Sequence, residues 1–237
     1  MSIARTTDVF PGNAPMQDGN KTPSFLRDLY RTRFKSQEES RIRVWRVLCE
    51  RFFQHIVKED ATLLELAAGQ CEFINNIKAK RKIAVDLNDD IYGFAGPNVE
   101  VLIGSTTDLS VIPAGSIDVV FVSNFLEHIP KNEIVITIQE CYRVLRSGGQ
   151  LIILQPNIRY CYKDYWMFFD HITPLDDRAL CELVAAVGFC VTKSIPQFLP
   201  YTTKSKLPHS PFLVSIYLLF PILWRFFGAQ ALLIAER

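Results

Sequence analysis

The chain has 237 residues, of which 49% are hydrophobic and 22% are charged. This composition excludes a mainly disordered protein, and the length suffices for one large domain with a substantial core. Lys and Arg together number 26 and Asp and Glu 25, which gives a formal net charge of +1. A nearly neutral chain lacks the excess of cations that phosphate backbones require, so we expect no binding to nucleic acid.

Residues 1–22 are polar, rich in Gly, Pro, Asn and Asp, and contain no apolar run of the kind found in signal peptides. We expect them to form a flexible arm ahead of a single domain over residues 23–237. The six cysteines are scattered, with no CxxC pair and no histidine at ligand spacing. We therefore expect neither disulfides nor a metal site, and a reducing, cytoplasmic location.

Apolar residues recur at steps of three and four from Arg41 to Val57, which predicts an amphipathic helix. Short β-rich runs then alternate with helical or loop segments, and the clearest helix covers Lys131–Leu145. Thr173 and Pro174 are typical of a helix start, and Gly188 is typical of a helix end. The predicted strands are Thr62–Leu66, Ile83–Asp86, Val99–Ile103, Ile117–Val122, Gln150–Leu154, Phe189–Ser194 and Ala231–Ala235. Continuous apolar strands that alternate with helices indicate a doubly wound α/β fold, in which helices cover both faces of a mainly parallel sheet.

The first strand ends in the stretch LLELAAGQCEFINNI. An acid at the strand end, Glu65, is followed by small residues and then by a helix, an arrangement that lets a ligand approach the backbone. The second strand ends in Asp86, an acid of the kind that accepts hydrogen bonds from ribose hydroxyls. The two acids favour a ribose-bearing cofactor over an ordinary strand–helix turn. The G-x-G-x-x-G pattern that serves a pyrophosphate is absent around Gly69, which argues against a dinucleotide.

With these motifs the chain resembles the class I S-adenosylmethionine-dependent methyltransferases of the small-molecule type. The resemblance runs from about Leu63 to Leu154 and, more weakly, to Gly188. It rests on the ordered segments ELAAGQCEF, AVDLN, GSIDVVFVSNFLEHI and YRVLRSGGQLIIL. Ala67 and Cys71 stand where the family has glycines. The resemblance implies S-adenosylmethionine as cofactor and a Rossmann-like seven-strand mixed sheet whose last strand is antiparallel.

The resemblance also assigns cofactor-binding roles. Glu65, Ala67 and Gly69 would line the methionine end of the cofactor, and Asp86 would bind the ribose. Leu87 and Asp108 would contact the adenine. Ser123 and Asn124 would lie near the transferred methyl group. Thr106 and Thr107 compete with Asp108 for the contact with the adenine amino group. For Asp108 itself, capping of a turn is the alternative role.

Methyl transfer is an in-line displacement, so an enzyme mainly aligns the nucleophile with the methyl group and adds a base where the acceptor must lose a proton. His128 and His171 are the candidate bases. The alternative role is packing against neighbouring loops for His128, and helix capping or loop fixing for His171. His171 is the better candidate because it follows Asp170 downstream of the fifth strand, where the family builds substrate contacts. An aromatic set either lines the acceptor pocket or covers the sheet: Tyr160, Tyr162, Tyr165, Trp166, Phe168 and Phe169.

The segment Pro211–Phe227 reads PFLVSIYLLFPILWRFF and lies in an insertion at about 197–228. It is too short for a membrane span, which needs ~20 residues, and Pro221 and Arg225 interrupt it. We expect an apolar cap near the acceptor entrance that contacts a membrane surface or a lipid-linked acceptor. A lid or homodimer interface that buries the same residues against protein is the alternative.

Together these features predict methyl transfer from S-adenosylmethionine to an oxygen of a small-molecule, glycan or lipid-linked acceptor. Oxygen is the default, because no mark of nitrogen, DNA or protein methylation is present. A catalytically weak cofactor-binding partner or scaffold subunit of the same fold is the first alternative, suggested by the altered glycine motif. A nicotinamide-dependent oxidoreductase is the second. The expected location is the cytoplasm, with peripheral contact at the inner membrane surface.

Overall fold

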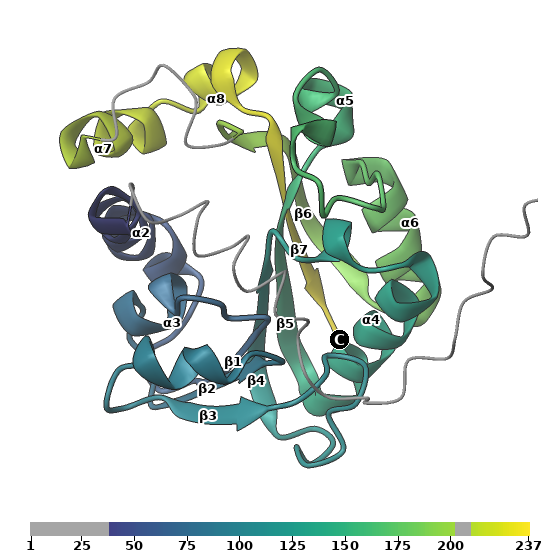
Figure 1. Ribbon diagram of the computed structural model, residues 1–237. Coiled ribbons are helices and arrows are strands. Elements are labelled where there is room, and N and C mark those ends of the chain that lie inside the picture. The colour runs from purple at the N-terminus through teal and green to yellow at the C-terminus, as the bar shows by residue number, and fades with distance from the viewer. Residues whose placement is uncertain (1–37, 202–209) are drawn as a thin grey trace, which may run out of the picture.

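The computed structural model describes residues 38–201 and 210–237, and these form a seven-stranded sheet in the order β3-β2-β1-β4-β5-β7-β6 (Figure 1). The strands are β1 Thr62–Leu66, β2 Arg81–Asp86, β3 Glu100–Ile103, β4 Ile117–Ser123, β5 Leu145–Pro156, β6 Cys190–Leu199 and β7 Gln230–Glu236. β1 to β5 pair in parallel, and β7 lies antiparallel between β5 and β6. The predicted mixed sheet with an antiparallel last strand is confirmed. The predicted arm, residues 1–22, lies outside the described residues.

Helices cover both faces of the sheet (Figure 1). α2 (Glu38–Arg51) and α3 (Glu72–Asn76) lie on one face, and α4 (Lys131–Val144) and α6 (Asp177–Val187) lie on the other. Each face has its own apolar core. In the first core the ring of Phe73 from α3 stacks on Phe121 from β4, with 3.6 Å between centroids. This packing explains why the apolar side chains of β4 run almost continuously along the sequence, since both faces of the strand are buried.

Two helix boundaries differ from the prediction. The helix expected to reach Val57 ends at Arg51 and is followed by the 3₁₀ turn η1, Phe53–His55. The last α-helix before β6 begins at Asp177 instead of next to Thr173. The Thr173 hydroxyl donates to the carbonyl of Ile129 and ties this loop to the segment after β4.

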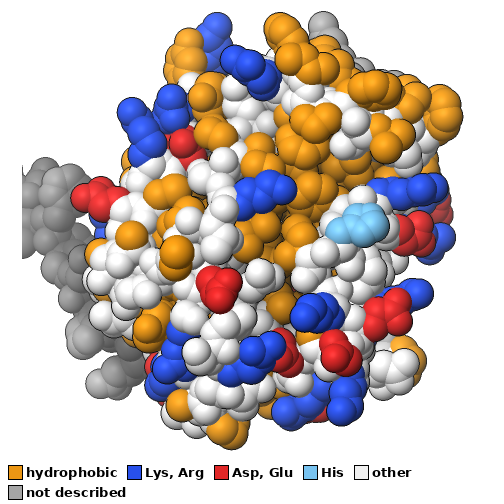
Figure 2. All heavy atoms as spheres, turned by 180° about the vertical axis from the view of Figure 1, so that it is seen from behind, with side chains coloured by type: hydrophobic (Ala, Val, Ile, Leu, Met, Phe, Trp, Pro, Cys, Tyr) orange, Lys and Arg blue, Asp and Glu red, His pale blue; other side chains and the backbone are white. Residues whose placement is uncertain are grey.

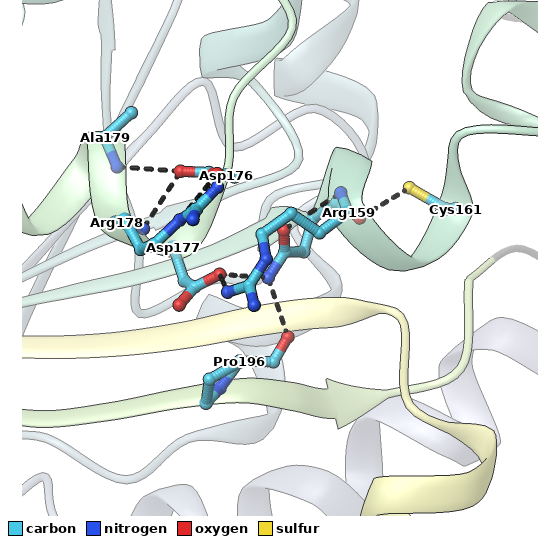
Figure 3. Close-up of polar contacts among 8 residues, drawn as sticks. Arg159, Cys161, Asp176, Asp177, Arg178, Ala179 and Pro196 are labelled. Carbon is cyan, nitrogen blue, oxygen red and sulfur yellow. Dashed lines mark hydrogen bonds and ion pairs between the residues drawn. The ribbon is translucent and has the colours of Figure 1, made fainter.

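Asp176 caps α6 instead (Figure 3). Its carboxylate accepts hydrogen bonds from the backbone amides of Arg178 and Ala179 at 3.0 and 2.8 Å. The neighbouring Asp177 accepts from the guanidinium of Arg159 at 2.8 Å, which ties α6 to α5 (Ile158–Cys161) (Figure 3). The predicted end of this helix is confirmed, because Gly188 follows it with a left-handed φ of 119°.

The apolar segment before β7 forms two short helices, α7 (Pro211–Leu219) and α8 (Pro221–Phe227). Pro221 ends the first and opens the second. Because Gln230 of β7 pairs with Pro156 at the end of β5, the helices lie at the edge where the parallel strands end (Figure 1). In the described part of the chain, no helix is long and apolar enough to cross a membrane. Figure 2 shows orange apolar side chains gathered over the end of the molecule that carries α7 and α8.

The remaining elements are short 3₁₀ turns that follow strand ends or connect them: η2 Asp89–Gly93, η3 Leu126–His128 and η4 Tyr165–Met167. η2 follows β2 and η3 follows β4 directly. They therefore place their side chains at the same edge of the sheet as α7 and α8.

Candidate functional site

The carboxyl ends of the parallel strands open into a cavity of about 760 Å³. Its wall is formed by the ends of β1, β2 and β4, by α2, and by α7 and α8. This volume lies in the upper part of the range of roughly 300–1,000 Å³ that small-molecule sites occupy. Seven of the eight predicted cofactor residues line it: Glu65, Ala67, Gly69, Asp86, Leu87, Ser123 and Asn124. Both predicted histidines, His128 and His171, line it as well.

Glu65 is buried where β1 ends, and only 5% of the residue is exposed. Its carboxylate accepts a hydrogen bond from the backbone amide of Ile74 in α3 at 3.0 Å. Burial raises the pKa of Glu65 well above its usual range, against the lowering effect of that hydrogen bond. A buried carboxylate of this kind is stabilised by a cationic group beside it. The cavity wall at this point is therefore suited to an ammonium or sulfonium group.

The loop that joins β1 to α3 has an unusual backbone. Ala67, Gly69 and Cys71 have φ values of 50°, 52° and 58°. Glycine adopts this left-handed region freely, whereas a residue with a Cβ is strained there by roughly 1–2 kcal/mol. Ala67 and Cys71 are the two positions where the sequence departs from the glycines of the family. The backbone of this loop thus has the conformation typical of glycine, although two of its residues carry a Cβ and are strained in it.

Asp86 ends β2 and braces this loop. One carboxylate oxygen accepts from the backbone amide of Gly69 at 2.8 Å, and the other accepts from the amide of Asn88 at 2.8 Å. Burial raises the pKa of Asp86, and interactions with the backbone amides of Asn88, Gly69 and Leu87 partly offset that rise. Each oxygen retains a further lone pair, since a carboxylate offers about four acceptor sites. The side chain can hold a vicinal diol while it orders the glycine loop.

Asp108 is the one predicted cofactor residue that does not line the cavity. It is exposed, and its carboxylate accepts from the backbone amide of Ser110 at 3.1 Å, the turn-capping role that was its alternative. The turn in which the amide of Asp108 donates to the carbonyl of Ser105 directs its side chain outward. Its competitor Thr106 is buried, lines the cavity and shares a hydrogen bond of 2.9 Å with Thr137. Of the two residues, Thr106 therefore lies where a ligand in the cavity could contact it, and the side chain of Asp108 lies outside.

β4 ends at Ser123 and Asn124 follows it, and both residues line the cavity. Asn124 has a left-handed φ of 48°, a conformation that asparagine tolerates better than most residues. Its amide side chain donates to the Ser123 hydroxyl at 2.9 Å, and its backbone amide donates to Leu154 in β5. The sharp turn after β4 brings η3 to the cavity wall.

The two histidines converge on Glu127. The ring centroids of His128 and His171 are 4.9 Å apart, and their Nε2 atoms lie 3.7 and 3.9 Å from Oε1 of Glu127. Burial raises the pKa of Glu127, against the lowering charge of His128. Burial lowers the pKa of His128, but its hydrogen bond to Asp170 and the charges of Glu127 and Asp170 prevail, so the pKa is raised. We call Glu127, His128 and His171 the EHH cluster.

Sequence reasoning missed several residues of this wall. Arg41 and Glu72 form an ion pair of 2.7 Å at the cavity, where α2 meets α3. Nothing in the local sequence relates them, because 31 residues separate them. Glu127 was part of a quoted motif but received no role of its own. Further apolar wall residues come from α2 and the two helices before β7: Trp45, Leu48, Leu213, Val214, Tyr217, Leu223 and Phe227.

Residues 64–153 match the family described as a methyltransferase domain. The match begins in β1 and ends in β5, so it contains the glycine-type loop, Asp86 and the end of β4. The chain carries an S-adenosylmethionine-dependent methyltransferase domain. A search of curated proteins finds no match to this methyltransferase.

Solved structures share the fold of this methyltransferase across most of its length. A methyltransferase from Archaeoglobus fulgidus superposes with a TM-score of 0.62 at 20% identity, covering 89% of this chain and 99% of the other. The protein bound to the Haloferax volcanii Trm112 methyltransferase activator gives 0.63 at 16% identity, with 88% and 94% covered. Geranyl diphosphate C-methyltransferase from Streptomyces coelicolor, solved with Mg²⁺ and S-adenosylhomocysteine, gives 0.54 at 15% identity, with 76% and 73% covered.

Proposed function

We propose that this methyltransferase transfers the methyl group of S-adenosylmethionine to a hydroxyl oxygen of an apolar, small or lipid-linked acceptor. The observation that carries the proposal is the shape of one cavity. Its β1–β2 end has the acids and the glycine-type loop suited to the cofactor, whereas its other end combines an apolar wall with the polar EHH cluster.

At the cofactor end, Asp86 binds the ribose hydroxyls and Glu65 lies beside the positively charged methionine moiety. The buried carboxylate of Glu65 supports this orientation, because a cation offsets its cost of desolvation. The Arg41–Glu72 pair lies at the same end and offers a guanidinium for the methionine carboxylate. Leu87 and Thr106 would hold the adenine, and Asn124 would be the residue beside the transferred methyl group.

At the acceptor end, the cavity wall is apolar. Leu213 and Tyr217 of α7, Leu223 and Phe227 of α8, and Trp45 of α2 all contribute to it. A hydrocarbon chain or ring would lose its hydration there without leaving polar groups unpaired. The EHH cluster is the polar part of this end, so an acceptor hydroxyl would be bound there. We assign the activation of that hydroxyl to the EHH cluster.

The exposed face of α7 and α8 supports a peripheral membrane location. Phe212 and Phe226 are 70% and 74% exposed, and Arg225 lies between apolar residues of α8. An amphipathic surface of this kind binds the interface of a membrane, from which a lipid-linked acceptor would enter. A protein partner on the same face is the second candidate, because a protein of this fold is bound to the Trm112 activator. The cytoplasm remains the proposed compartment, consistent with six free cysteines.

The test supplies methyl-labelled S-adenosylmethionine together with a cell extract separated into lipid and aqueous fractions. We expect label to move into the lipid fraction, and NMR of the product to show an O-methyl group. The matched control is Gly69→Val, which blocks the cofactor end and should transfer nothing. Label confined to aqueous compounds, or an N- or C-methyl product, would refute the proposal. Tight cofactor binding without transfer to either fraction would support the scaffold alternative instead.

A further inference from the structure

The EHH cluster brings together three side chains that bind metal ions in many proteins. One ligand atom from each of Glu127, His128 and His171 lies within 4.8 Å of the other two. Two ligand atoms about 2.1 Å from a shared ion lie between roughly 3.0 and 4.2 Å apart. The separations from Oε1 of Glu127 to the two Nε2 atoms, 3.7 and 3.9 Å, fall in this range. A small rotation of either imidazole would bring the ring nitrogens to the same spacing.

Outer partners orient two of the three side chains. The Nδ1 atom of His128 lies 3.1 Å from the backbone carbonyl and 3.2 Å from the carboxylate of Asp170. Since both of these oxygens accept hydrogen bonds, Nδ1 carries the proton, and the lone pair of the neutral ring is on Nε2, which faces Glu127. A carboxylate behind a histidine is the usual outer partner of a histidine that binds a metal. Gln155 likewise donates to Oε2 of Glu127 at 2.8 Å and turns Oε1 toward the rings.

The backbone holds the cluster together before any ligand arrives. The amides of Ile172 and Thr173 both donate to the carbonyl of Glu127, at 2.9 and 3.0 Å. These bonds fix the loop that carries His171 against η3, which carries Glu127 and His128. Tyr165 adds to this support, because its hydroxyl donates to the carbonyl of Thr173 and its ring contacts His171. Such rigidity is what a metal site requires, since ligands must be held near their bonding geometry.

We propose that the EHH cluster binds one divalent transition-metal ion, of the kind that imidazole favours, at the acceptor end of the cavity. Two histidines and one carboxylate leave coordination positions open toward the cavity. The chemistry of the site rests on the function proposed above: an acceptor hydroxyl bound to the cation loses its proton to solvent more readily. Its oxygen then bonds to the methyl carbon as the carbon–sulfur bond breaks, and the bonding pair passes to the sulfur of S-adenosylhomocysteine.

This proposal revises the expectation of no metal site. That expectation rested on the cysteines and their spacing, and the cysteines do not take part here. The ligands are one adjacent pair and a histidine that follows 43 positions after His128. Only the contact between η3 and the loop before α6 brings them together.

The test uses the full-length chain without an affinity tag, stripped by a chelator and dialysed. Co²⁺ is titrated as the probe and followed by visible absorption, and Zn²⁺ is titrated by calorimetry. We expect one equivalent per chain and a rise in the melting temperature with metal concentration. His128→Ala and His171→Ala should each weaken binding by tenfold or more, and Asp170→Asn by about 10–100-fold. Exposed His55 supplies the matched control, since His55→Ala should bind like wild type.

Melting curves without metal show whether each variant folds. His171→Gln, a smaller change, is used if His171→Ala does not fold. Failure of the wild type to bind an equivalent of either ion, or unchanged binding in both histidine variants, would overturn the proposal. Metal binding is measured without cofactor or acceptor, so its result does not depend on whether the proposed function is correct. One bound equivalent with no hydroxyl methylated would refute the proposed function and keep the site. Full methyl transfer after chelation would refute the role of the ion in the reaction.

Discussion

The two ends of the cavity are built in different ways. At the β1–β2 end, the glycine-type loop and Asp86 follow their strands directly, and backbone amides hold them. At the end formed by α7, α8 and the EHH cluster, side chains from distant segments meet, and apolar packing holds the wall. The first end depends on backbone geometry, so single changes there act on a ligand through the loop. The second end depends on side chains at the surfaces of packed helices and loops, so substitutions can change its chemistry without changing the sheet.

The largest expected effect comes from Gly69→Val, which tests the backbone-built end. Gly69 lines the cavity at a φ of 52°, where a β-branched residue is strongly strained. We expect calorimetry to detect no S-adenosylmethionine binding. Gly93→Ala is the control, because an added Cβ at Gly93 meets no atom within 4 Å and its φ is not in the left-handed range. Binding in a folded Gly69→Val protein would mean that the cofactor does not occupy this end.

A smaller loss is expected for Asp86→Ala. It removes two charge-assisted hydrogen bonds to the ribose, each worth roughly 1.5–3 kcal/mol, so cofactor affinity should fall at least about tenfold. Asp108→Ala is a matched acid-to-alanine control outside the cavity, and its affinity should equal that of the wild type. The reverse pattern, with Asp108 decisive and Asp86 neutral, would contradict both the ribose assignment to Asp86 and the preference for Thr106 over Asp108.

The apolar end is tested by membrane binding. The double change Phe212→Glu and Phe226→Glu places two charges on the exposed face of α7 and α8 without touching the core. Wild type should float with anionic liposomes, and this variant should stay in the soluble fraction. Leu218 and Tyr217 are unsuitable targets because both are buried. The wild type could instead stay in the soluble fraction and run as a dimer that the double change makes monomeric. That result would show that this face binds a second copy of the chain and not a membrane.

Glu65→Gln should raise the stability of the ligand-free protein and lower its affinity for the cofactor. Because burial raises the pKa of Glu65 above its unfolded value, ionisation opposes folding, and this cost appears as the pH rises above the unfolded pKa. The neutral amide keeps an acceptor for the Ile74 amide and avoids the cost. The ligand-free variant should therefore melt a few degrees above wild type at pH 8 and level with it near pH 4. A variant that melts below wild type at pH 8 would show that the carboxylate has a cationic partner without the cofactor.

The smallest effect is expected for Ala67→Gly. Glycine removes a strain of roughly 1–2 kcal/mol at this left-handed position, but it also raises the conformational entropy of the unfolded chain. The free energy of unfolding should therefore rise by about 0.5–1 kcal/mol. Chemical denaturation should detect the gain. Ala68→Gly in the same loop has no positive φ to relieve, so it should destabilise the chain. Equal effects at the two positions would show that the strain at Ala67 is not stored in the folded loop.

The sheet, and the edge at which the candidate cofactor residues gather, could be predicted from local signals. Buried strands show as continuous apolar runs, and the residues after β1, β2 and β4 must lie at one edge because those strands are parallel. The sequence could not place the side chain of Asp108 outside the cavity, because its direction depends on the turn in which the Asp108 amide donates to the carbonyl of Ser105. The start of α6 was misplaced because Asp176, and not Thr173, accepts the hydrogen bonds of the first helical amides.

The sequence by itself thus determined the order of elements, the class of cofactor and the acids at two strand ends, since each depends on residues that are neighbours along the chain. Only the tertiary structure decided the rest. It paired Arg41 with Glu72, packed α7 against α2, and set His171 beside Glu127 and His128. These contacts join segments tens of residues apart, and local periodicity carries no information about which distant side chains share a cavity.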